Sequence, residues 1–214
     1  MDIYREGAIE VLRLGPLGPY GNNAYVIADG AAKQSLIVDM PAEGEKILEA
    51  LGDAHVQAIV ATHWHPDHWG SYDLVRGTTG APVYVHADEV RIPPERIDAR
   101  VVDGQEIVVG SARLTVVHTP GHTPGSICLR LGKVLLTGDT LFPGGPGRTQ
   151  TPEDLQTVIR SIAERLLALE DDVLVWPGHG DPGTIGQARA GYQQFAAHPH
   201  RADLSGDVSW DMTE

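Results

Sequence analysis

Four side chains able to bind metal ions are grouped in one short stretch of the chain. The stretch is Thr62-His63-Trp64-His65-Pro66-Asp67-His68-Trp69-Gly70, and it follows the apolar residues 58–61. In extended backbone, residues two apart project to the same side, so His63 and His65 can bind one ion together. Pro66 must turn the chain, and Asp67 and His68 can then reach a second position. The pattern therefore indicates a metal site at the end of a buried strand.

Three further segments repeat this design of an apolar strand, a glycine-containing turn and one potential ligand. Residues 114–117 lead to His122, residues 134–137 lead to Asp139, and residues 173–176 lead to His179. Strand ends that present histidine or aspartate at one sheet edge can converge on a single site, and glycine lets backbone approach closely. Taken singly, each residue could belong to a polar surface loop. Together they favour a metal centre.

The elements that must position these residues are mostly strands. Apolar, β-branched runs punctuated by Gly, Pro and Asp predict strands at 8–14, 24–28, 35–39, 56–61, 82–86, 106–109, 112–118, 126–131, 133–137 and 173–176. Helical spacing predicts helices at 42–51, 152–168 and 184–197, with Thr151 as the cap of the second. The polar tail from His198 is expected on the surface. We expect sheets packed between helices, in one domain spanning residues 1–214.

Composition narrows the function. The 214 residues carry a formal net charge of −13, which argues against nucleic acid and against an anionic membrane surface as partners. The single cysteine, Cys128, cannot form an intrachain disulfide, and the first residues lack the pattern of a signal peptide. No apolar stretch approaches the ~18 residues of a membrane-spanning helix. A cytoplasmic protein that acts on a small molecule is the expectation, and the oligomeric state is open.

The motifs, taken in order, resemble the metallo-β-lactamase superfamily. They are THWHPDHWG at 62–70, TPGHTPGS at 119–126, LLTGDTLF at 135–142 and VWPGHG at 175–180. The resemblance extends from about Asn22 to Gly180. It implies an α/β fold, the αββα metallo-β-lactamase sandwich, in which two mixed β-sheets are flanked by helices and the metals lie at one edge of the sheets.

Carried over residue by residue, the resemblance implies two divalent metal ions. His63, His65 and His122 would bind the first, Asp67, His68 and His179 the second, and Asp139 would bridge both. Asp67 and Asp139 are also the residues expected to act in catalysis. Two such ions lower the pKa of a bound water and polarise a substrate carbonyl. Imidazole and carboxylate ligands suit zinc, our first expectation, and also iron or manganese.

The segment 138–149 resembles glyoxalase II, the hydroxyacylglutathione hydrolases, and their shorter relatives. In that family the Gly-rich turn and the arginine after it line the thioester pocket, so Arg148 is the expected substrate-binding residue; a structural role in holding the loop is as plausible. β-Lactamases of this fold lack an aspartate at the bridging position, so Asp139 disfavours lactam hydrolysis. Full-length glyoxalase II has a C-terminal helical domain that supplies contacts to glutathione, whereas only about thirty-five residues follow His179, so glutathione is not the expected thiol carrier with the same force as the thioester itself.

Thioester hydrolysis by a binuclear metallohydrolase is therefore the leading expectation. A persulfide dioxygenase with a single iron shares these motifs and also lacks the helical domain. Lactone hydrolysis on the same centre is a third possibility, and a binding module without activity is a fourth, although the intact ligand set speaks against it.

Overall fold

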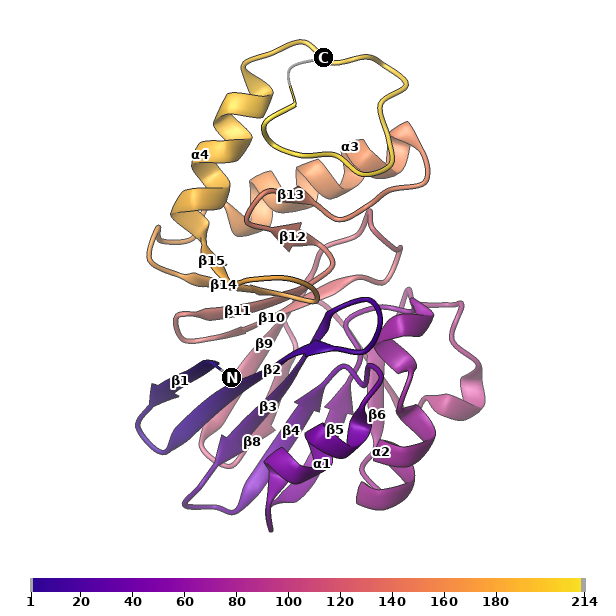
Figure 1. Cartoon of the computed structure of the whole chain (residues 1–214), viewed down its shortest axis with the longest axis vertical. Helices are drawn as coiled ribbons and strands as arrows, with labels where there is room; N and C mark the ends of the chain where they lie inside the picture. Colours follow the sequence, from indigo (N-terminus) through magenta and orange to yellow (C-terminus); the bar gives the residue numbers. More distant parts are fainter. Residues whose placement is uncertain (1, 213–214) are drawn as a thin grey trace.

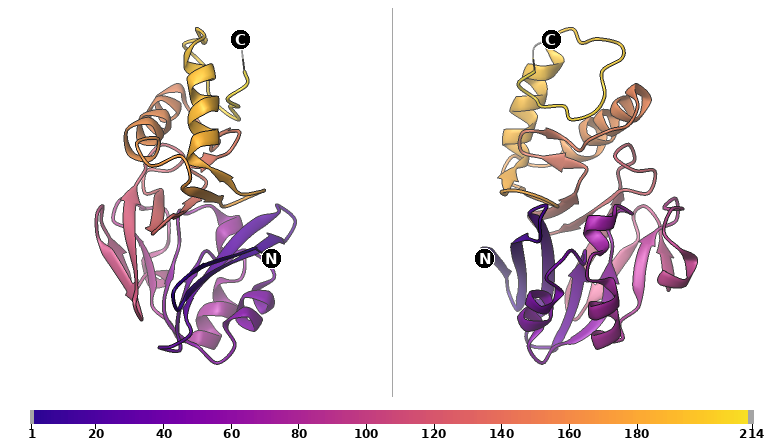
Figure 2. Two further views of the ribbon diagram at one scale, coloured as in Figure 1. Left: turned by 90° about the vertical axis from the view of Figure 1, so that its left-hand side faces the viewer. Right: turned by 45° about the vertical axis from the view of Figure 1, so that its right-hand side comes forward.

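A computed structural model describes residues 2–212 of the chain. Two β-sheets lie face to face between two pairs of helices (Figures 1 and 2). This is the expected αββα sandwich of two mixed sheets. Among the described residues, no helix is long and apolar enough to cross a membrane.

The first sheet has seven strands, which follow one another in space in their order along the chain. They are β1 (Asp2–Glu6), β2 (Ile9–Leu17), β3 (Asn22–Asp29), β4 (Gln34–Val38), β5 (His55–Val60), β6 (Val83–His86) and β7 (Ala99–Val101). The strands from β1 to β4 pair antiparallel, whereas those from β4 to β7 pair parallel. The parallel part needs crossover connections, and α1 (Gly44–Leu51) and α2 (Tyr72–Thr79) supply two of them.

The second sheet has six strands in the order β15-β14-β11-β10-β9-β8. They are β8 (Glu106–Val109), β9 (Ala112–His118), β10 (Ile127–Leu131), β11 (Val134–Gly138), β14 (Leu174–Pro177) and β15 (Gly183–Thr184). A small hairpin of β12 (Leu141–Phe142) and β13 (Gly145–Pro146) follows β11. The helices α3 (Pro152–Ser161), which continues into a π-helical turn Ile162–Leu166, and α4 (Ile185–Ala196) gather at one end of the molecule (Figure 1).

Three apolar layers hold these elements together. The central layer lies between the sheets and includes Tyr25, Leu36, Leu114 and Leu129. The second packs the outer face of the first sheet against α1 and α2, for example through Ile47 and Val75. The third packs the other sheet against α3 and α4 and contains Cys128, which is buried and free. Alternating side chains on each strand thus serve two layers at once.

All ten predicted strands and three predicted helices are present, with shifts of a few residues at their ends. The sequence did not predict β1, β7, α2 or the two-residue strands. Helix α2 buries only Val75 and contains Gly77 and two threonines, which are weak helix formers. Strand β1 is exposed except for the half-buried Tyr4, so it lacks an apolar alternation.

The tail from His198 does not lie wholly on the surface as expected. Val208 and Trp210 are buried, at 6% and 3% exposure, in the layer that covers the second sheet. The indole of Trp210 packs edge-on against Phe195 and Tyr192 of α4. This part of the tail is therefore anchored to the helices by apolar contact.

Candidate metal centre

The seven residues predicted as metal ligands come together at one edge of the sandwich. Each follows a strand: His63, His65, Asp67 and His68 follow β5, His122 follows β9, Asp139 follows β11 and His179 follows β14. The loops of both sheets therefore contribute. Nitrogen and oxygen atoms of three sets, each within 4.8 Å of one another, could hold an ion: His63, His65 and His122; Asp67, His68 and His179; and His63, His68 and Asp139.

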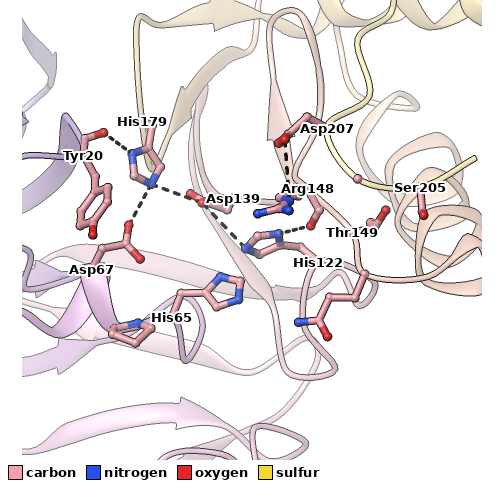
Figure 3. Close-up of a pocket in the computed structure, with 13 residues that line it drawn as sticks. Tyr20, His65, Asp67, His122, Asp139, Arg148, Thr149, His179, Ser205 and Asp207 are labelled. Atoms are coloured by element: carbon pink, nitrogen blue, oxygen red, sulfur yellow. Dashed lines mark hydrogen bonds and ion pairs between the residues drawn. The ribbon is translucent and has the colours of Figure 1, made fainter.

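Asp139 lies between the other two sets, as a bridging ligand requires. Its Oδ1 is 3.4 Å from Nε2 of His68, and its Oδ2 is 3.4 Å from Nε2 of His179. The same Oδ2 is 3.8 Å from Nε2 of His122, which belongs to the first set (Figure 3). One carboxylate thus faces both halves of the centre. The first half is the set His63, His65 and His122, and the second half is the set Asp67, His68 and His179.

Buried polar atoms at this point lack partners within the described chain. Nε2 of His63, Nε2 of His122 and Oδ1 of Asp139 are inaccessible to solvent and make no hydrogen bond. A buried polar group without a partner costs about 1–3 kcal/mol. Such atoms, converging from three loops, fit a bound metal ion.

Four of the histidines use Nδ1 for a hydrogen bond inside the protein. Nδ1 of His122 donates to the carbonyl oxygen of Arg148 at 2.8 Å, and Nδ1 of His179 donates to that of Tyr20 at 3.0 Å. Nδ1 of His63 lies 3.0 Å from the hydroxyl of Thr62, which it reaches as donor. With the proton on Nδ1, the lone pair of Nε2 points into the centre, as metal ligation needs.

The fourth, His68, is held by Asp39, a residue that the sequence analysis did not single out. Asp39 is buried and follows β4; its Oδ2 accepts from Nδ1 of His68 at 2.8 Å and from the hydroxyl of Thr62 at 2.8 Å. Since Thr62 donates its proton to Asp39, its oxygen is free to accept from His63. Asp39 therefore orients one ligand of each half. The candidate ligands were selected because each follows an apolar strand. Asp39 directly follows β4, so the same criterion could have found it.

Asn22, the first residue of β3, supports the second half in the same way. Its side-chain amide donates to Oδ2 of Asp67 at 2.7 Å, and its backbone bridges to His179. Oδ2 of Asp67 and Nε2 of His179 lie 3.2 Å apart, so both atoms face the same position in the centre.

Two glycines allow the ligand loops to pass close together. A Cβ at Gly178 would lie 2.2 Å from Oδ1 of Asp139, and one at Gly147 would lie 1.7 Å from the carbonyl oxygen of the same residue. A larger residue at either position would require Asp139 to move, by its side chain for Gly178 and by its backbone for Gly147. The expected role of glycine, close approach of backbone to the site, is met here.

The charge states differ between the two halves. Burial lowers the pKa of His63 and of His122, and it lowers the pKa of His65 to about 4. These three imidazoles are therefore neutral at pH 7, the form in which histidine binds a metal.

In the second half of the centre, nearby carboxylates raise the pKa values of the histidines more than burial lowers them. Burial acts to lower the pKa of His68 and of His179, but Asp139 outweighs it, together with Asp39 for His68 and Asp67 for His179. The pKa of His68 is raised well above its ordinary value, and that of His179 is raised to about 10. The same contacts hold the pKa of the Asp139 carboxyl well below its usual range, against the opposing effect of burial. A cation is stabilised at this point, whether a proton or a metal ion.

The centre forms the floor of an open cavity of about 1040 Å³. His65, Asp67, His122, Asp139 and His179 face it (Figure 3). The rim comes from three separate segments, namely Tyr20, residues 148–150 and residues 205–207. Arg148 thus lies at the rim, as the sequence analysis expected for a residue that contacts substrate. Tyr20 and residues 205–207 were not anticipated.

Comparison with known proteins decides the family. The family model described as the metallo-beta-lactamase superfamily matches residues 17–179, which contain all seven candidate ligands. The chain belongs to the metallo-β-lactamase superfamily. Its members include metal-dependent hydrolases, and this superfamily member carries the histidine and aspartate sets described above.

Similar proteins of this superfamily have several descriptions. "Hydroxyacylglutathione hydrolase GloC" of Haemophilus influenzae is 32% identical over 197 residues, which are 81% of this chain and 92% of that protein. The crystal structure of BLEG-1 B3 metallo-beta-lactamase shares 33% identity with a TM-score of 0.71, over 83% of this chain and 95% of that one. TTHA1623, solved in a di-iron-bound form, shares 29% identity with a TM-score of 0.69, over 82% of this chain and 96% of that one.

Proposed function

We propose that this superfamily member is a binuclear metallohydrolase that cleaves thioesters, using small acyl thioesters as substrates. The observation that carries the proposal is the position of Asp139, whose carboxylate faces both ligand sets at the floor of an open cavity. A second observation favours thioesters. The short protein described as a hydroxyacylglutathione hydrolase is matched over 92% of its length, so that description does not require a long C-terminal extension.

His63, His65 and His122 would hold one ion, Asp67, His68 and His179 the other, and Asp139 both. When bound, two divalent ions such as zinc would lower the pKa of a water between them and polarise the thioester carbonyl. Iron is an alternative consistent with the di-iron form of TTHA1623.

The chain's own residues would orient these ligands and the substrate. Asp39 and Asn22 fix the imidazole of His68 and the carboxylate of Asp67 by hydrogen bonds of 2.8 and 2.7 Å, so the ligands are held before substrate arrives. Asp67 and Asp139 line the cavity floor, where their carboxylates would hold the ions beside the attacking water, and the second oxygen of Asp67 could accept its proton. The carbonyl would lie over this floor, and the rest of the substrate would extend toward Tyr20 and Arg148. Preorganised ligands of this kind save the cost of reorganisation during the reaction.

A thiol-release assay on zinc-loaded protein tests the proposal. The substrates are S-D-lactoylglutathione, a lactoyl ester of N-acetylcysteamine, a small lactone and a β-lactam, with oxygen uptake on glutathione persulfide measured in parallel on iron-loaded protein. We expect thiol release from at least one thioester and slower or no opening of the β-lactam. Oxygen uptake on the persulfide without release from any thioester would overturn the proposal in favour of a dioxygenase. Preferential opening of the lactone or the β-lactam would overturn it in favour of those hydrolases.

A further inference from the structure

The C-terminal segment 205–208 forms one wall of the cavity above the metal centre. Ser205, Gly206 and Asp207 line the large cavity, and Asp207 and Val208 line an adjoining one of about 310 Å³. Arg148 lies on the boundary and lines both cavities. Figure 3 shows Asp207 directed at Arg148 across the opening. A substrate that extends from the centre along this wall contacts the pair.

The segment is held in place on both sides of Asp207. On one side, Gly206 and Thr149 exchange two backbone hydrogen bonds of 3.0 and 3.1 Å. On the other, the backbone N–H of Trp210 donates to the carbonyl of Gly144 at 2.8 Å, and the indole is buried. The backbone of Arg148 is fixed as well, because its carbonyl accepts from His122. The two side chains are therefore kept as neighbours by the fold around them.

The positive charge of Arg148 in this wall is offset by the carboxylate of Asp207. Nε of Arg148 lies 3.7 Å from Oδ2 of Asp207. Among the residues that line the two cavities, Arg148 is the only lysine or arginine. An anionic group that binds the remaining N–H groups of Arg148 would lie beside the carboxylate of Asp207, which repels it. The net charge of −13 adds to this disadvantage at low ionic strength.

We infer that Asp207 masks Arg148 and makes the enzyme prefer thioesters that are uncharged where they meet this wall. An uncharged polar group can accept a hydrogen bond from Arg148 and donate one to Asp207 without separating them. A carboxylate, such as those of glutathione, can accept from Arg148 but cannot donate to Asp207 and is repelled by its charge. The inference rests on the proposed thioesterase function, and it assigns Asp207 as a specificity-determining residue of that site.

The test compares two esters of the same acyl group in Asp207→Asn. Lactoylglutathione has an anionic thiol part, and lactoyl-N-acetylcysteamine has an uncharged one. Because the pair is exposed to solvent, the gain from unmasking is that of a surface ion pair, so we expect the KM of the glutathione ester to fall about two- to fivefold. The KM of the uncharged ester should change much less, so that the ratio of the two KM values shifts in favour of the glutathione ester. The gain should shrink at 0.5 M salt, where screening is strong.

Two controls isolate the charge at this position. Asp203→Asn removes the same charge from the same tail, but Asp203 pairs with Arg201 and does not line either cavity. It should leave the KM ratio of the two esters as in the wild type. Arg148→Ala should abolish the gain when combined with Asp207→Asn. An equal change for both esters, or an equal effect of Asp203→Asn, would overturn the inference.

A binding measurement separates failure of this inference from failure of the proposed function. Calorimetric titration of zinc-loaded protein with S-hexylglutathione, which cannot be hydrolysed, needs no turnover. Tighter binding to Asp207→Asn than to the wild type, by a similar factor, supports masking even if no thioester is cleaved. Equal affinity of the two proteins overturns masking even if thioesters are cleaved.

Discussion

Four of the seven ligands of the candidate centre are held by hydrogen bonds to residues from other parts of the chain. Asp39 binds His68, Asn22 binds Asp67, and the carbonyls of Tyr20 and Arg148 receive the protons of His179 and His122. Charge is also balanced across loops, because the negative carboxylate of Asp139 faces the imidazoles of His68 and His179. The properties of single residues here depend on contacts between residues that are 26 to 159 positions apart in sequence.

The bridging carboxylate gives the sharpest prediction at this scale. Asp139→Asn keeps the shape of the side chain but removes the charge that faces both ligand sets. We expect weaker binding at both positions and a loss of turnover by several orders of magnitude, with the fold retained. Metal analysis, kcat and circular dichroism check this. Asp53→Asn, an exposed carboxylate, serves as control, and a variant at 139 with full metal content and normal turnover would refute the bridging role.

Asp39 should act through the ligands that it orients. Asp39→Asn removes the acceptor of the His68 proton and of the Thr62 hydroxyl. Loss of such a supporting contact typically weakens metal affinity 10- to 100-fold. Competition with a chromogenic chelator measures the zinc affinity. Asp29→Asn is the matched control, because Asp29 is also buried and hydrogen-bonded, to Ala31, Ala32 and Ser111. Equal zinc affinities in the two variants would count against the role of Asp39.

At the scale of elements, the helices that cover the second sheet begin with reciprocal caps. The hydroxyl of Thr151 accepts from the backbone N–H of Asp154, whose carboxylate accepts from the N–H of Thr151. Thr184 and Gln187 repeat this arrangement at the start of α4. These caps are local, which explains why Thr151 could be named from the sequence. They fix the start of α3 directly after the loop that carries Arg148 and Thr149.

Removal of the first cap should lower stability without altering the centre. Thr151→Ala is expected to cost about 1 kcal/mol in the free energy of unfolding, which for a chain of this size lowers Tm by roughly 2–4 °C. Thr151→Ser keeps the hydroxyl and should restore most of the loss. Thermal melts of the metal-loaded proteins provide the measurement. A Tm for Thr151→Ala equal to that of the wild type would show that the cap does not stabilise the helix in the folded protein.

At the scale of the whole molecule, the centre joins the two sheets. Four of the seven candidate ligands follow β5 of the first sheet and three follow strands of the second sheet, and the histidines of the first set come from both sheets. Ions bound here would link the two halves of the sandwich. Stability and metal content should therefore change together, since a ligand that binds only the folded state stabilises it.

The chain is expected to bind close to two metal ions, because seven ligand side chains exceed the needs of one four-coordinate ion. Removal of the metal ions by a chelator should lower the Tm of the protein and abolish turnover. Addition of zinc should restore the Tm and the turnover. At a free zinc concentration a hundredfold above Kd, the stabilisation is about 2.7 kcal/mol per site. Elemental analysis and thermal melts measure the two effects. One ion or fewer per chain after reconstitution would contradict this prediction.

The sequence by itself determined the features that depend on local pattern. The strands that became β2 to β6 and β8 to β11 alternate apolar and polar residues or are apolar throughout, and the capping pattern marked α3. The seven ligand candidates stood out because each follows such a strand within a few residues. Strand β1 and helix α2 escaped prediction because they are held by their neighbours: β1 pairs with β2 while most of its own side chains remain exposed, and α2 buries little more than Val75.

Only the tertiary structure decided what surrounds the ligands. Asn22, Asp39 and Tyr20 are ordinary residues in sequence, and they act on the centre because β3, β4 and the loop before β3 end beside it. The wall formed by residues 205–208 is a stronger case. A polar tail reads as surface from its composition, but the burial of Trp210 against α4 and the pairing of Gly206 with Thr149 bring Asp207 to Arg148. Contacts between positions so far apart depend on the packed fold, and no local pattern of residues encodes them.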